Sequence, residues 1–474
     1  MADLLAVVDI GKTHAKLILV EGESGRVTHA AEHPCPPIPG PQTRQLDVHG
    51  IEAWLIGALR EASGRERITT IVPVAHGAAC VVLDAAGSVL AAPDYEDPVF
   101  ARDHATYAKR RDPFSETFSP HLPLGLNVGQ QLHFLQVRHP GLFARAEAIL
   151  PYAQYWAWRF SGVATAEITS LGSHTDLWRP LARGFSALAE RQGWAALIPP
   201  LRRAGDVLGP VTAGFAAAAG LDPACRVLCG IHDSNASYLC HLVSRPDDRP
   251  FAVVSSGTWT IVMARGVDLA RLREERDMLA NIDAFGAPVA TARFMGGREY
   301  SAVAGEAGLA ATLDGPALER VVRRGAMALP TFAAGGGPFQ GSAGRLVDAE
   351  GLDAAERAAL ATVYSALVVD VMLDLLGVSG AVILDGPLAM NPLFPGLLAA
   401  FRPESQVLIG ENRAGSVVAA RLLACGLDIP VPAPRAVVGF ELPDLSAYRV
   451  AWQGGLGPQA PAGVQGAEPP GLLT

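Results

Sequence analysis

Short apolar runs of strand length alternate along this chain with longer segments whose apolar residues recur at helical spacing. The strand-like runs are Leu4–Val8, Ala15–Val20, Ile68–Val74 and Ala79–Leu83. The segments with helical spacing are Ile51–Ala62, Val128–Val137, Ala146–Phe160 and Ala361–Leu376. Alternation between these two periods is typical of proteins that pack helices against the faces of a sheet. The pattern therefore predicts an α/β fold.

Two segments half a chain apart repeat the same pattern. Ala6–Thr13 reads AVVDIGKT and Ala252–Thr258 reads AVVSSGT, and a second apolar run follows each of them. A strand, a small polar turn around glycine and another strand predict a hairpin in both places. The echo predicts two similar domains that face each other.

The domain boundary is expected where the run Arg245–Pro250, RPDDRP, interrupts the apolar pattern. This places one domain at residues 1–245, a second at 250–430 and a C-terminal extension at 431–474. The tail of the extension, from about residue 454, is rich in Gly, Pro and Ala and is expected to be flexible.

Composition narrows the possible functions. The chain has 474 residues, of which 50% are hydrophobic and 18% charged, and its net charge is −9. That length suits roughly two or three domains of ~150 residues, and the acidic balance argues against binding nucleic acid or an anionic membrane. No apolar run approaches the ~20 residues of a membrane span, and the N-terminus lacks the basic start of a signal peptide. We expect a cytoplasmic protein that does not bind membranes.

The first glycine turn carries groups suited to phosphate. Gly11 lets backbone N–H groups approach an anion, Thr13 and His14 add side-chain donors, and Lys12 and Lys16 add positive charge. Lysine occurs at only one other position in the chain, so this clustering is unusual, although a solvated turn would also tolerate it. Asp9, at the end of the preceding strand, could hold a magnesium ion through water.

The second turn offers donors without bulk, namely Ser255, Ser256, Gly257 and Thr258. If the two turns face each other, they could hold the two ends of one phosphate chain. A single turn of this type is a weak signal, whereas the pair is a much stronger one.

A third element is the segment Val227–Ser237, which reads as a strand, a turn and then a helix. Asp233 stands where the helix begins. One interpretation is an N-cap, a role that Asp and Ser often fill. The other is a general base that accepts a proton from a substrate hydroxyl during phosphoryl transfer.

Together these motifs resemble the FGGY family of carbohydrate kinases. The similarity rests on Asp9–Thr13 (DIGKT), Gly230–Asp233 (GIHD), Ser255–Trp259 (SSGTW), Val382–Pro392 (VILDGPLAMNP) and Gly415–Ala420 (GSVVAA), and covers roughly residues 4–425 in the family's order. The resemblance implies two ribonuclease-H-like domains of the actin-like ATPase type with a cleft between them. Within the family, the rhamnulokinase and L-fuculokinase branch is the most similar.

The resemblance also implies roles for individual residues. Asp233 would be the catalytic proton acceptor, and Asp9 would serve magnesium. The groups implied at ATP are Gly11, Lys12, Thr13, His14, Lys16, Gly257 and Thr258 at the phosphates, with Gly386 and Asn391 at the adenosine end. Those implied at the sugar are Gly77, His232, Ser234 and Arg293.

Three departures from the branch concern the sugar and the purine. Ala79 stands where an acidic sugar contact is expected, Arg293 where an asparagine is expected, and Asp385 where a glycine is usual. We therefore expect an ATP- and magnesium-dependent sugar kinase acting on a 6-deoxy ketose such as L-rhamnulose or L-fuculose. A kinase for another ketopentose or polyol, and a non-catalytic ATP-binding regulator, are the alternatives. A homodimer is one open arrangement.

Overall fold

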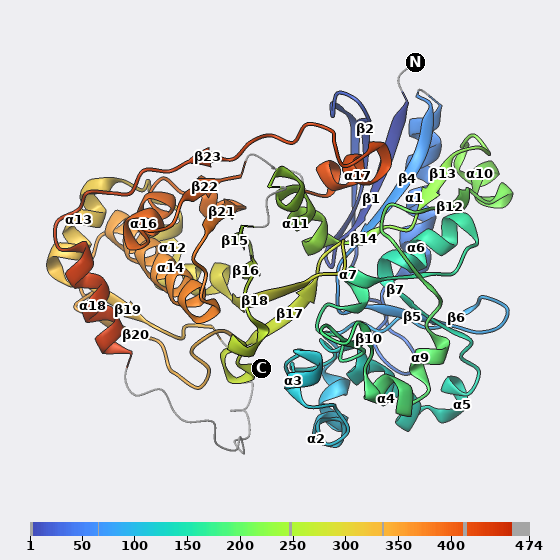
Figure 1. Ribbon diagram of the computed structural model, residues 1–474, viewed down its shortest axis with the longest axis horizontal. Helices are drawn as coiled ribbons and strands as arrows, with labels where there is room; N and C mark the ends of the chain where they lie inside the picture. The colour runs from blue at the N-terminus through green and yellow to red at the C-terminus, as the bar shows by residue number, and fades with distance from the viewer. Residues whose placement is uncertain (1–2, 65, 246–248, 334–335, 411–414, 457–474) are drawn as a thin grey trace.

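The computed structural model describes residues 3–64, 66–245, 249–333, 336–410 and 415–456. Within these ranges, two mixed sheets of seven strands each form the centres of two bodies that lie side by side (Figure 1). This arrangement confirms the α/β fold.

The first sheet has the order β12-β13-β4-β1-β2-β3, with β14 also paired to β4. Its strands are β1 (Leu4–Ile10), β2 (His14–Glu21), β3 (Val27–Pro34), β4 (Ile68–Ala75), β12 (Val207–Pro210), β13 (Arg226–Leu228) and β14 (Ile231–His232). An antiparallel meander, β3-β2-β1, continues into β4, which is parallel to β1.

The second sheet repeats this topology, with the order β17-β18-β16-β15-β21-β22-β23. Its strands are β15 (Phe251–Ser256), β16 (Thr260–Arg265), β17 (Met278–Ile282), β18 (Pro288–Phe294), β21 (Ala381–Asp385), β22 (Val407–Ile409) and β23 (Arg435–Ala436). β15 pairs antiparallel with β16 and parallel with β21, as β1 does with β2 and β4. The echo between the two glycine turns therefore reflects two copies of one fold.

β1 is apolar from Leu4 to Val8 because helices cover both of its faces. Leu4, Ala6 and Val8 pack with α1 (Val48–Ser63), α6 (Tyr152–Ser161) and α10 (Ala213–Ala219). Leu5 and Val7, which point the other way, pack with α11 (Asp233–Ser244) and α17 (Gly415–Cys425). Successive side chains of a strand face opposite sides, so a strand covered on both sides has no polar alternation.

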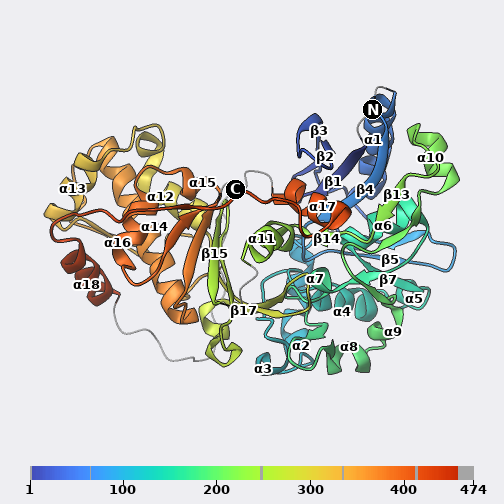
Figure 2. The ribbon, with the colours of Figure 1, turned by 45° about the horizontal axis from the view of Figure 1, so that its top comes forward.

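α11 lies between the two sheets (Figures 1 and 2). Ala236 and Leu239 pack against the Leu5 and Val7 face of the first sheet. Tyr238 and Leu242 pack with residues of β15, β21 and β22 in the second sheet. The helix therefore belongs to both cores, and its N-terminal residue Asp233 has a fixed position relative to both sheets.

A smaller layer of helices and short strands lies below the first sheet in the view of Figure 1. Its strands are β5 (Cys80–Leu83), β6 (Val89–Ala91), β7 (Ala148–Pro151), β8 (Ala166–Glu167), β9 (Trp178–Arg179), β10 (Gly184–Phe185) and β11 (Leu201–Arg202). Its helices are η1 (Pro98–Asp103), α2 (His104–Ala108), α3 (Phe114–Thr117), α4 (Val128–Arg138), α5 (Pro140–Phe143), α7 (Ile168–Leu171), α8 (Ala187–Arg191) and α9 (Trp194–Leu197).

The second body packs around a central helix, α14 (Ala354–Leu376), which begins at a capping box formed by Asp353 and Glu356. Its other elements are η2 (Leu269–Arg271), η3 (Glu274–Arg276), α12 (Gly296–Leu309), α13 (Gly315–Arg324), β19 (Met327–Leu329), β20 (Arg345–Val347), α15 (Pro387–Met390), α16 (Phe394–Phe401) and α18 (Leu445–Gly455). Contrary to the sequence-based expectation, α14 is apolar and long enough to span a membrane by length and composition. Most of it is buried, which identifies it as a core helix.

The predicted helix Ala146–Phe160 is wrong in its first part. Residues Ala148–Pro151 form β7, which pairs with β5, and α6 begins only at Tyr152. Pro151 explains the difference, because a proline disfavours the helical conformation of the residue before it. The helices expected at Ile51–Ala62, Val128–Val137 and Ala361–Leu376 are confirmed as parts of α1, α4 and α14.

The chain crosses back to the first sheet after β22. α17 lies within the range expected for the second domain, yet it packs on α11 and β1. Arg421 of α17 donates hydrogen bonds to the carbonyl oxygens of Gly22 (3.0 Å) and Glu23 (2.8 Å), after β2. The chain then returns to the second body, where Trp452 of α18 is fully buried. Residues 457–474 of the expected flexible tail lie outside the described residues.

Replacing Arg421 with methionine should lower the free energy of unfolding by about 2 kcal/mol, since two carbonyl groups lose a charged donor while the apolar packing is kept. Urea denaturation would measure the change. Arg323→Met is the matched control, because Arg323 is exposed on α13 and its one ion-pair partner in the described part of the chain is Glu319 of the same helix. Its effect should stay within about 0.5 kcal/mol. Equal effects of the two substitutions would contradict an anchoring role for Arg421.

Candidate active site

The N-terminus of α11 gathers polar groups from several elements of the first body. β14 pairs with β4 so that His232 lies beside Ala75, and Asp233 follows as the first residue of α11. The side chain of Asp233 is 38% exposed, whereas that of His232 is buried. Burial in this site raises the pKa of Asp233, and its backbone and hydroxyl hydrogen bonds with Ser234 oppose the rise. A carboxylate with a raised pKa and an accessible oxygen can act as a general base.

Asp9 lies at the end of β1, and the charge of Asp233 acts on it. Burial, followed by repulsion from Asp233, raises the pKa of Asp9 to about 6, and a hydrogen bond with Ser416 of α17 opposes the rise. Two carboxylates that disfavour each other's ionisation form a site that a divalent cation would stabilise. Asp9 and Ser416 are far apart in the sequence, and the return of α17 to the first sheet brings them together.

The first glycine turn joins β1 to β2, as expected. Lys12 points its ammonium group at Asp94 (Nζ to Oδ1, 2.9 Å) and Glu96 (Nζ to Oε2, 3.3 Å), and it lies 5.3 Å above the ring of Tyr95. Burial, followed by the charges of Glu96, Asp94 and Asp233, raises the pKa of Tyr95, so this cluster borders the site. The role of Lys12 at the ATP phosphates stays a prediction.

The other side chains of this turn lie closer to solvent. Half-exposed His14 and Lys16 both approach Glu32 of β3, at 3.5 Å and 4.0 Å. The Nδ1 atom of His14 lies 3.1 Å from the Thr13 hydroxyl. The backbone N–H of Gly11 donates to the carbonyl oxygen of His14 (2.9 Å), which closes the turn.

Both ring nitrogens of His232 have polar neighbours. Its Nδ1 atom lies 3.1 Å from Nδ2 of Asn235 and 3.2 Å from the Ser173 hydroxyl, and its Nε2 atom lies 3.2 Å from Oδ1 of Asp233. Burial lowers the pKa of His232 to about 4, so the imidazole is neutral at pH 7. Gly77 packs directly against this ring, because a Cβ atom there would lie 2.6 Å from Nε2.

A buried carboxyl group supports the backbone of His232. The Thr169 hydroxyl accepts a hydrogen bond from the His232 N–H (3.1 Å) and donates one to Oε2 of Glu167 (2.6 Å). The same oxygen accepts from the N–H groups of Thr169 and Ser170, whereas Oε1 has no partner among the described residues. Burial raises the pKa of Glu167 to about 7.

The second body contributes a pocket of about 310 Å³ beside the second glycine turn. Its lining includes Ser256, Gly257, Gly297, Tyr300, Leu388 and Asn391. Gly386 precedes the lining residue Pro387, and a Cβ atom at Gly386 would lie 2.1 Å from the carbonyl oxygen of Ser256, where φ is +79°. The Ser256 hydroxyl donates to the Asp385 carbonyl oxygen (2.8 Å) and accepts from the Leu388 N–H (2.9 Å). The glycine turn and the 385–388 segment therefore form one unit.

Two departures from the family pattern have structural partners. Asp385 lies 2.5 Å from Nε2 of His241 on α11, which links the second sheet to the helix that carries Asp233. Arg293 pairs with Asp277 (Nη2 to Oδ1, 3.1 Å), and its guanidinium lies 4.6 Å above the ring of Trp259. The charge of Arg293 helps to lower the pKa of His174, so Arg293 lies near the first body. Its contact with a sugar stays a prediction.

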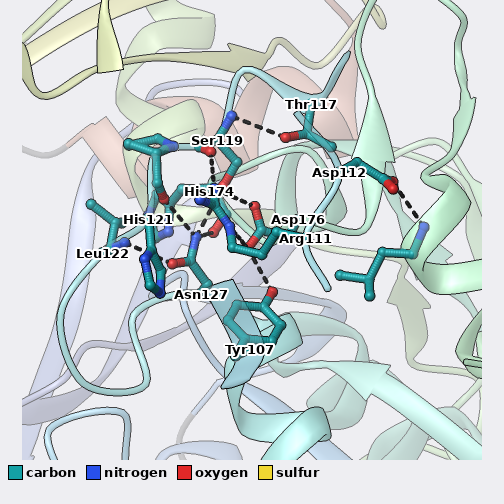
Figure 3. A network of polar contacts seen from close by, with 12 residues as sticks. Tyr107, Arg111, Asp112, Thr117, Ser119, His121, Leu122, Asn127, His174 and Asp176 are labelled. Atoms are coloured by element: carbon teal, nitrogen blue, oxygen red, sulfur yellow. Dashed lines mark hydrogen bonds and ion pairs between the residues drawn. The ribbon is translucent and has the colours of Figure 1, made fainter. Parts of the chain in front are cut away.

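Arg111, Asn127 and Asp176 belong to a polar network beside His174 (Figure 3). The Asn127 amide bonds the main chain at Pro120, Leu122 and His174, and it also bonds the Ser119 hydroxyl. Arg111 pairs with Asp176 and reaches Glu274 of the second body, at 3.2 Å. The network therefore fastens one edge of the second body to the first.

The structure brings together Asp9, Gly77, His232, Asp233 and Ser234 around the start of α11. It places Gly257 and Asn391 in the lining of the second body's pocket, with Gly386 next to the lining residue Pro387. Sequence reasoning missed His76, Tyr95, Ser173, Asn235 and Ser416. His76 lies close enough to Asp233 to interact with it electrostatically, and burial lowers the pKa of His76. The Nε2 atom of His76 is buried without a partner among the described residues. The position of His76 next to Gly77, which the family resemblance implies at the sugar, is the sequence signal that could have identified it.

Comparisons with known proteins agree with this geometry. Residues 248–432 match the description "Carbohydrate kinase FGGY, C-terminal domain". The chain is 38% identical to a carbohydrate kinase from Novosphingobium aromaticivorans, with a TM-score of 0.87 over 96% of this chain and 99% of that one. A xylulose kinase from Rhodospirillum rubrum is 18% identical, with a TM-score of 0.75 over 95% and 98% of the two chains. A glycerol kinase from Plasmodium falciparum, determined with ADP, is 11% identical, with a TM-score of 0.77 over 96% and 98%. No curated protein sequence matches the chain.

The raised pKa of Glu167 predicts a loss of stability between pH 4.5, the ordinary value, and about pH 7. The folded state holds this proton more tightly than the unfolded state, so its contribution is complete below pH 4.5 and is lost as the pH rises through 7. The contribution is about 3 kcal/mol. Glu167→Gln cannot ionise, so its free energy of unfolding, measured by urea denaturation, should fall less than that of the wild type between pH 5 and pH 8. Parallel pH profiles for the two proteins would exclude Glu167 as the source.

Proposed function

The chain belongs to the FGGY family of carbohydrate kinases, and we propose that it transfers the γ-phosphoryl group of ATP to a primary hydroxyl of a ketose, with Asp233 as the general base. The observation that carries the proposal is the position of this carboxylate. It lies at the N-terminus of the helix between the two sheets, with Asp9 close by, and one of its oxygens lacks a hydrogen bond among the described residues.

The proposed reaction is an in-line displacement. Asp233 accepts the proton of the sugar hydroxyl, the hydroxyl oxygen attacks the γ-phosphorus, and the bond to the bridging oxygen breaks as ADP leaves. Most of the rate enhancement comes from positioning and from neutralising charge on the phosphates. The backbone N–H groups of the two glycine turns, together with Thr13, Lys16 and Thr258, would supply that neutralisation. Exclusion of water from the space between the two bodies would suppress hydrolysis of ATP.

Asp9 fits a magnesium site. Asp9 is half-buried. Its carboxylate interacts with the charge of Asp233 and accepts a hydrogen bond from the Ser416 hydroxyl, so it offers the oxygen ligands that magnesium prefers. Magnesium bound there through water would neutralise charge on the polyphosphate.

The nucleotide is assigned to the pocket of the second body. Gly257 and Gly297 have no side chains that would narrow the pocket, and Leu388 and Tyr300 offer apolar surface to a purine. Gly386 and Asn391 would lie at the adenosine end of the nucleotide. Asn391 also accepts hydrogen bonds from the N–H groups of Leu393 (2.9 Å) and Phe394 (3.0 Å), which fixes the chain that forms this wall.

For the sugar we favour a 6-deoxy ketose such as L-rhamnulose or L-fuculose, on the resemblance of the motifs around His232 and Ser256. A ketopentose or a polyol is the second candidate, since a xylulose kinase and a glycerol kinase share the fold. A non-catalytic ATP-binding role is disfavoured, because Asp9, Asp233 and both glycine turns are all present.

Release of ADP from MgATP, followed by a coupled assay across ketoses, aldoses and polyols, should show one sugar well above the background without sugar. With that sugar, Asp233→Asn should reduce kcat by roughly 10²–10⁴-fold, because the amide cannot accept the proton. ATP binding, measured by calorimetry, should change little. Turnover of the variant at the wild-type rate would remove Asp233 from the mechanism.

Gly386→Ala should raise the KM for ATP by about tenfold or more, while the sugar KM stays within about twofold. The reason is that the new methyl group would collide with the Ser256 carbonyl and alanine disfavours the left-handed backbone required there. Gly214→Ala is the matched control, because a Cβ atom at Gly214 meets nothing within 4 Å. An unchanged KM for ATP in Gly386→Ala would place the nucleotide elsewhere.

A further inference from the structure

We propose that the hydrogen bond between His241 and Asp385 couples the nucleotide pocket to the helix that carries the base, so that both are positioning residues for phosphoryl transfer. His241 acts through α11, whose first residue is Asp233. Asp385 acts through the end of β21, next to Gly386. The consequence for catalysis rests on the proposed function, which takes Asp233 as the base and the pocket of the second body as the nucleotide site.

The hydrogen bond is buried between the two bodies. Nε2 of His241 lies 2.5 Å from Oδ2 of Asp385, and the two side chains are only 2% and 10% exposed. A carboxylate can only accept, so the imidazole is the donor. Removal of either partner would leave the other buried and unsatisfied, which costs more than the loss of an exposed hydrogen bond. The pair therefore opposes any displacement of α11 from β21.

The other carboxylate oxygen of Asp385 packs against main chain. A Cβ atom at Gly410, which follows β22, would lie 2.1 Å from Oδ1 of Asp385 and 3.2 Å from Cε1 of His241. The ends of β21 and β22 therefore leave the carboxylate little room to turn. The hydrogen bond fixes a direction as well as a distance between the second sheet and α11.

The main chain of Asp385 continues into the wall of the nucleotide pocket. Its carbonyl oxygen accepts from the Ser256 hydroxyl (2.8 Å), and the same hydroxyl accepts from the Leu388 N–H (2.9 Å). Ser256 and Leu388 both line the pocket, and β21 pairs with β15 so that Asp385 lies beside Ser255. A nucleotide that orders this wall thus orders the residue whose side chain holds α11.

His241 lies on the same side of α11 as Asp233. The two residues are eight positions apart in one unbroken helix, with Ser237 halfway between them, and positions four apart lie one above the other. Gly415 packs against this side, because a Cβ atom there would lie 2.3 Å from the Ser237 hydroxyl oxygen. Since a short helix moves as a rigid rod, a shift at His241 is carried along it to Asp233.

Apolar packing alone would hold α11 less exactly. Tyr238 and Leu242 pack with Phe251 and Ile383 of the second sheet, but apolar contacts have no preferred direction and tolerate a small slide or rotation. Loss of the hydrogen bond should therefore leave the helix docked and its position less well defined. A misplacement of about 1 Å is enough to slow a positioned reaction by roughly 10²-fold.

Substitutions that keep or remove the donor test this role. The amide of His241→Gln can still donate to Asp385, whereas the thioether of His241→Met cannot. With the sugar found by the panel, His241→Met should lower kcat by about tenfold or more, while both KM values stay within about threefold. His241→Gln should keep kcat within about threefold of the wild-type value. Equal kcat values for the two variants would contradict the positioning role.

Two controls accompany this comparison. Calorimetric titration with MgADP counts the folded nucleotide pockets, so that kcat is expressed per binding site and a poorly folded variant is recognised. His139→Met makes the same substitution between α4 and α5 of the first body, where the ring lies 5.6 Å from that of Phe134. It should keep the wild-type kcat. A decrease as large as that of His241→Met would mean that the effect is not specific to the pair.

A double-mutant cycle tests the pair itself. Asp385→Ala should lower kcat by about the same factor as His241→Met, and the double variant should be no slower than either single variant, because one interaction can be lost only once. Effects that multiply in the double variant would show two independent roles and exclude the coupling.

The coupling can also be measured without any sugar. Hydrogen exchange of the full chain, followed by mass spectrometry, should slow in residues 238–244 of α11 when MgADP binds to the wild type. In His241→Met these residues should not respond, although MgADP still binds with a Kd within about threefold. A response of equal size in both proteins, or in neither, would overturn the inference.

The outcomes separate this inference from the proposed function. A flat sugar panel, combined with a response of α11 to MgADP that His241→Met abolishes, would overturn the proposed function and leave the coupling standing. Turnover in the sugar panel without any response of α11 to MgADP would leave the kinase standing and overturn the coupling.

Discussion

The burial of α11 between two sheets is the constraint on which the rest of the structure depends. One side of the helix completes the core over Leu5 and Val7, and the other completes the core over Phe251 and Val253. A helix that belongs to both cores cannot follow one body when the other moves without losing apolar contacts. Its first residue, Asp233, is therefore held relative to the glycine turns of both sheets, which is what an in-line transfer requires.

Two further links strengthen this arrangement. Asp385 pairs with His241 on the same helix, and α17 returns across the domain boundary so that Ser416 meets Asp9. The departure of Asp385 from the family's glycine is thus matched by a partner on α11. Both links join residues of the second half of the chain to the site in the first half, so neither body completes the site alone.

Desolvation sets the chemistry of the site. It raises the pKa values of Asp9, Asp233 and Glu167 and lowers those of His76 and His232. The site therefore holds neutral imidazoles beside carboxyl groups whose ionised form is disfavoured. A bound cation, or a hydrogen bond from a substrate hydroxyl, would stabilise the ionised form. A low-dielectric site strengthens each remaining hydrogen bond, such as the one that the His232 N–H donates to the Thr169 hydroxyl.

By itself, the sequence determined the elements whose signals are local. The hairpins around Gly11 and Gly257, the duplication, and the position of Asp233 at a strand-to-helix junction all depend on residues within one short segment. Only the tertiary structure decided the partners of those residues. Lys12 meets Asp94, Arg293 meets Asp277 and Asp9 meets Ser416. The physical reason is that periodicity and turn chemistry act over a few residues, whereas burial and hydrogen-bond partners depend on how distant segments pack.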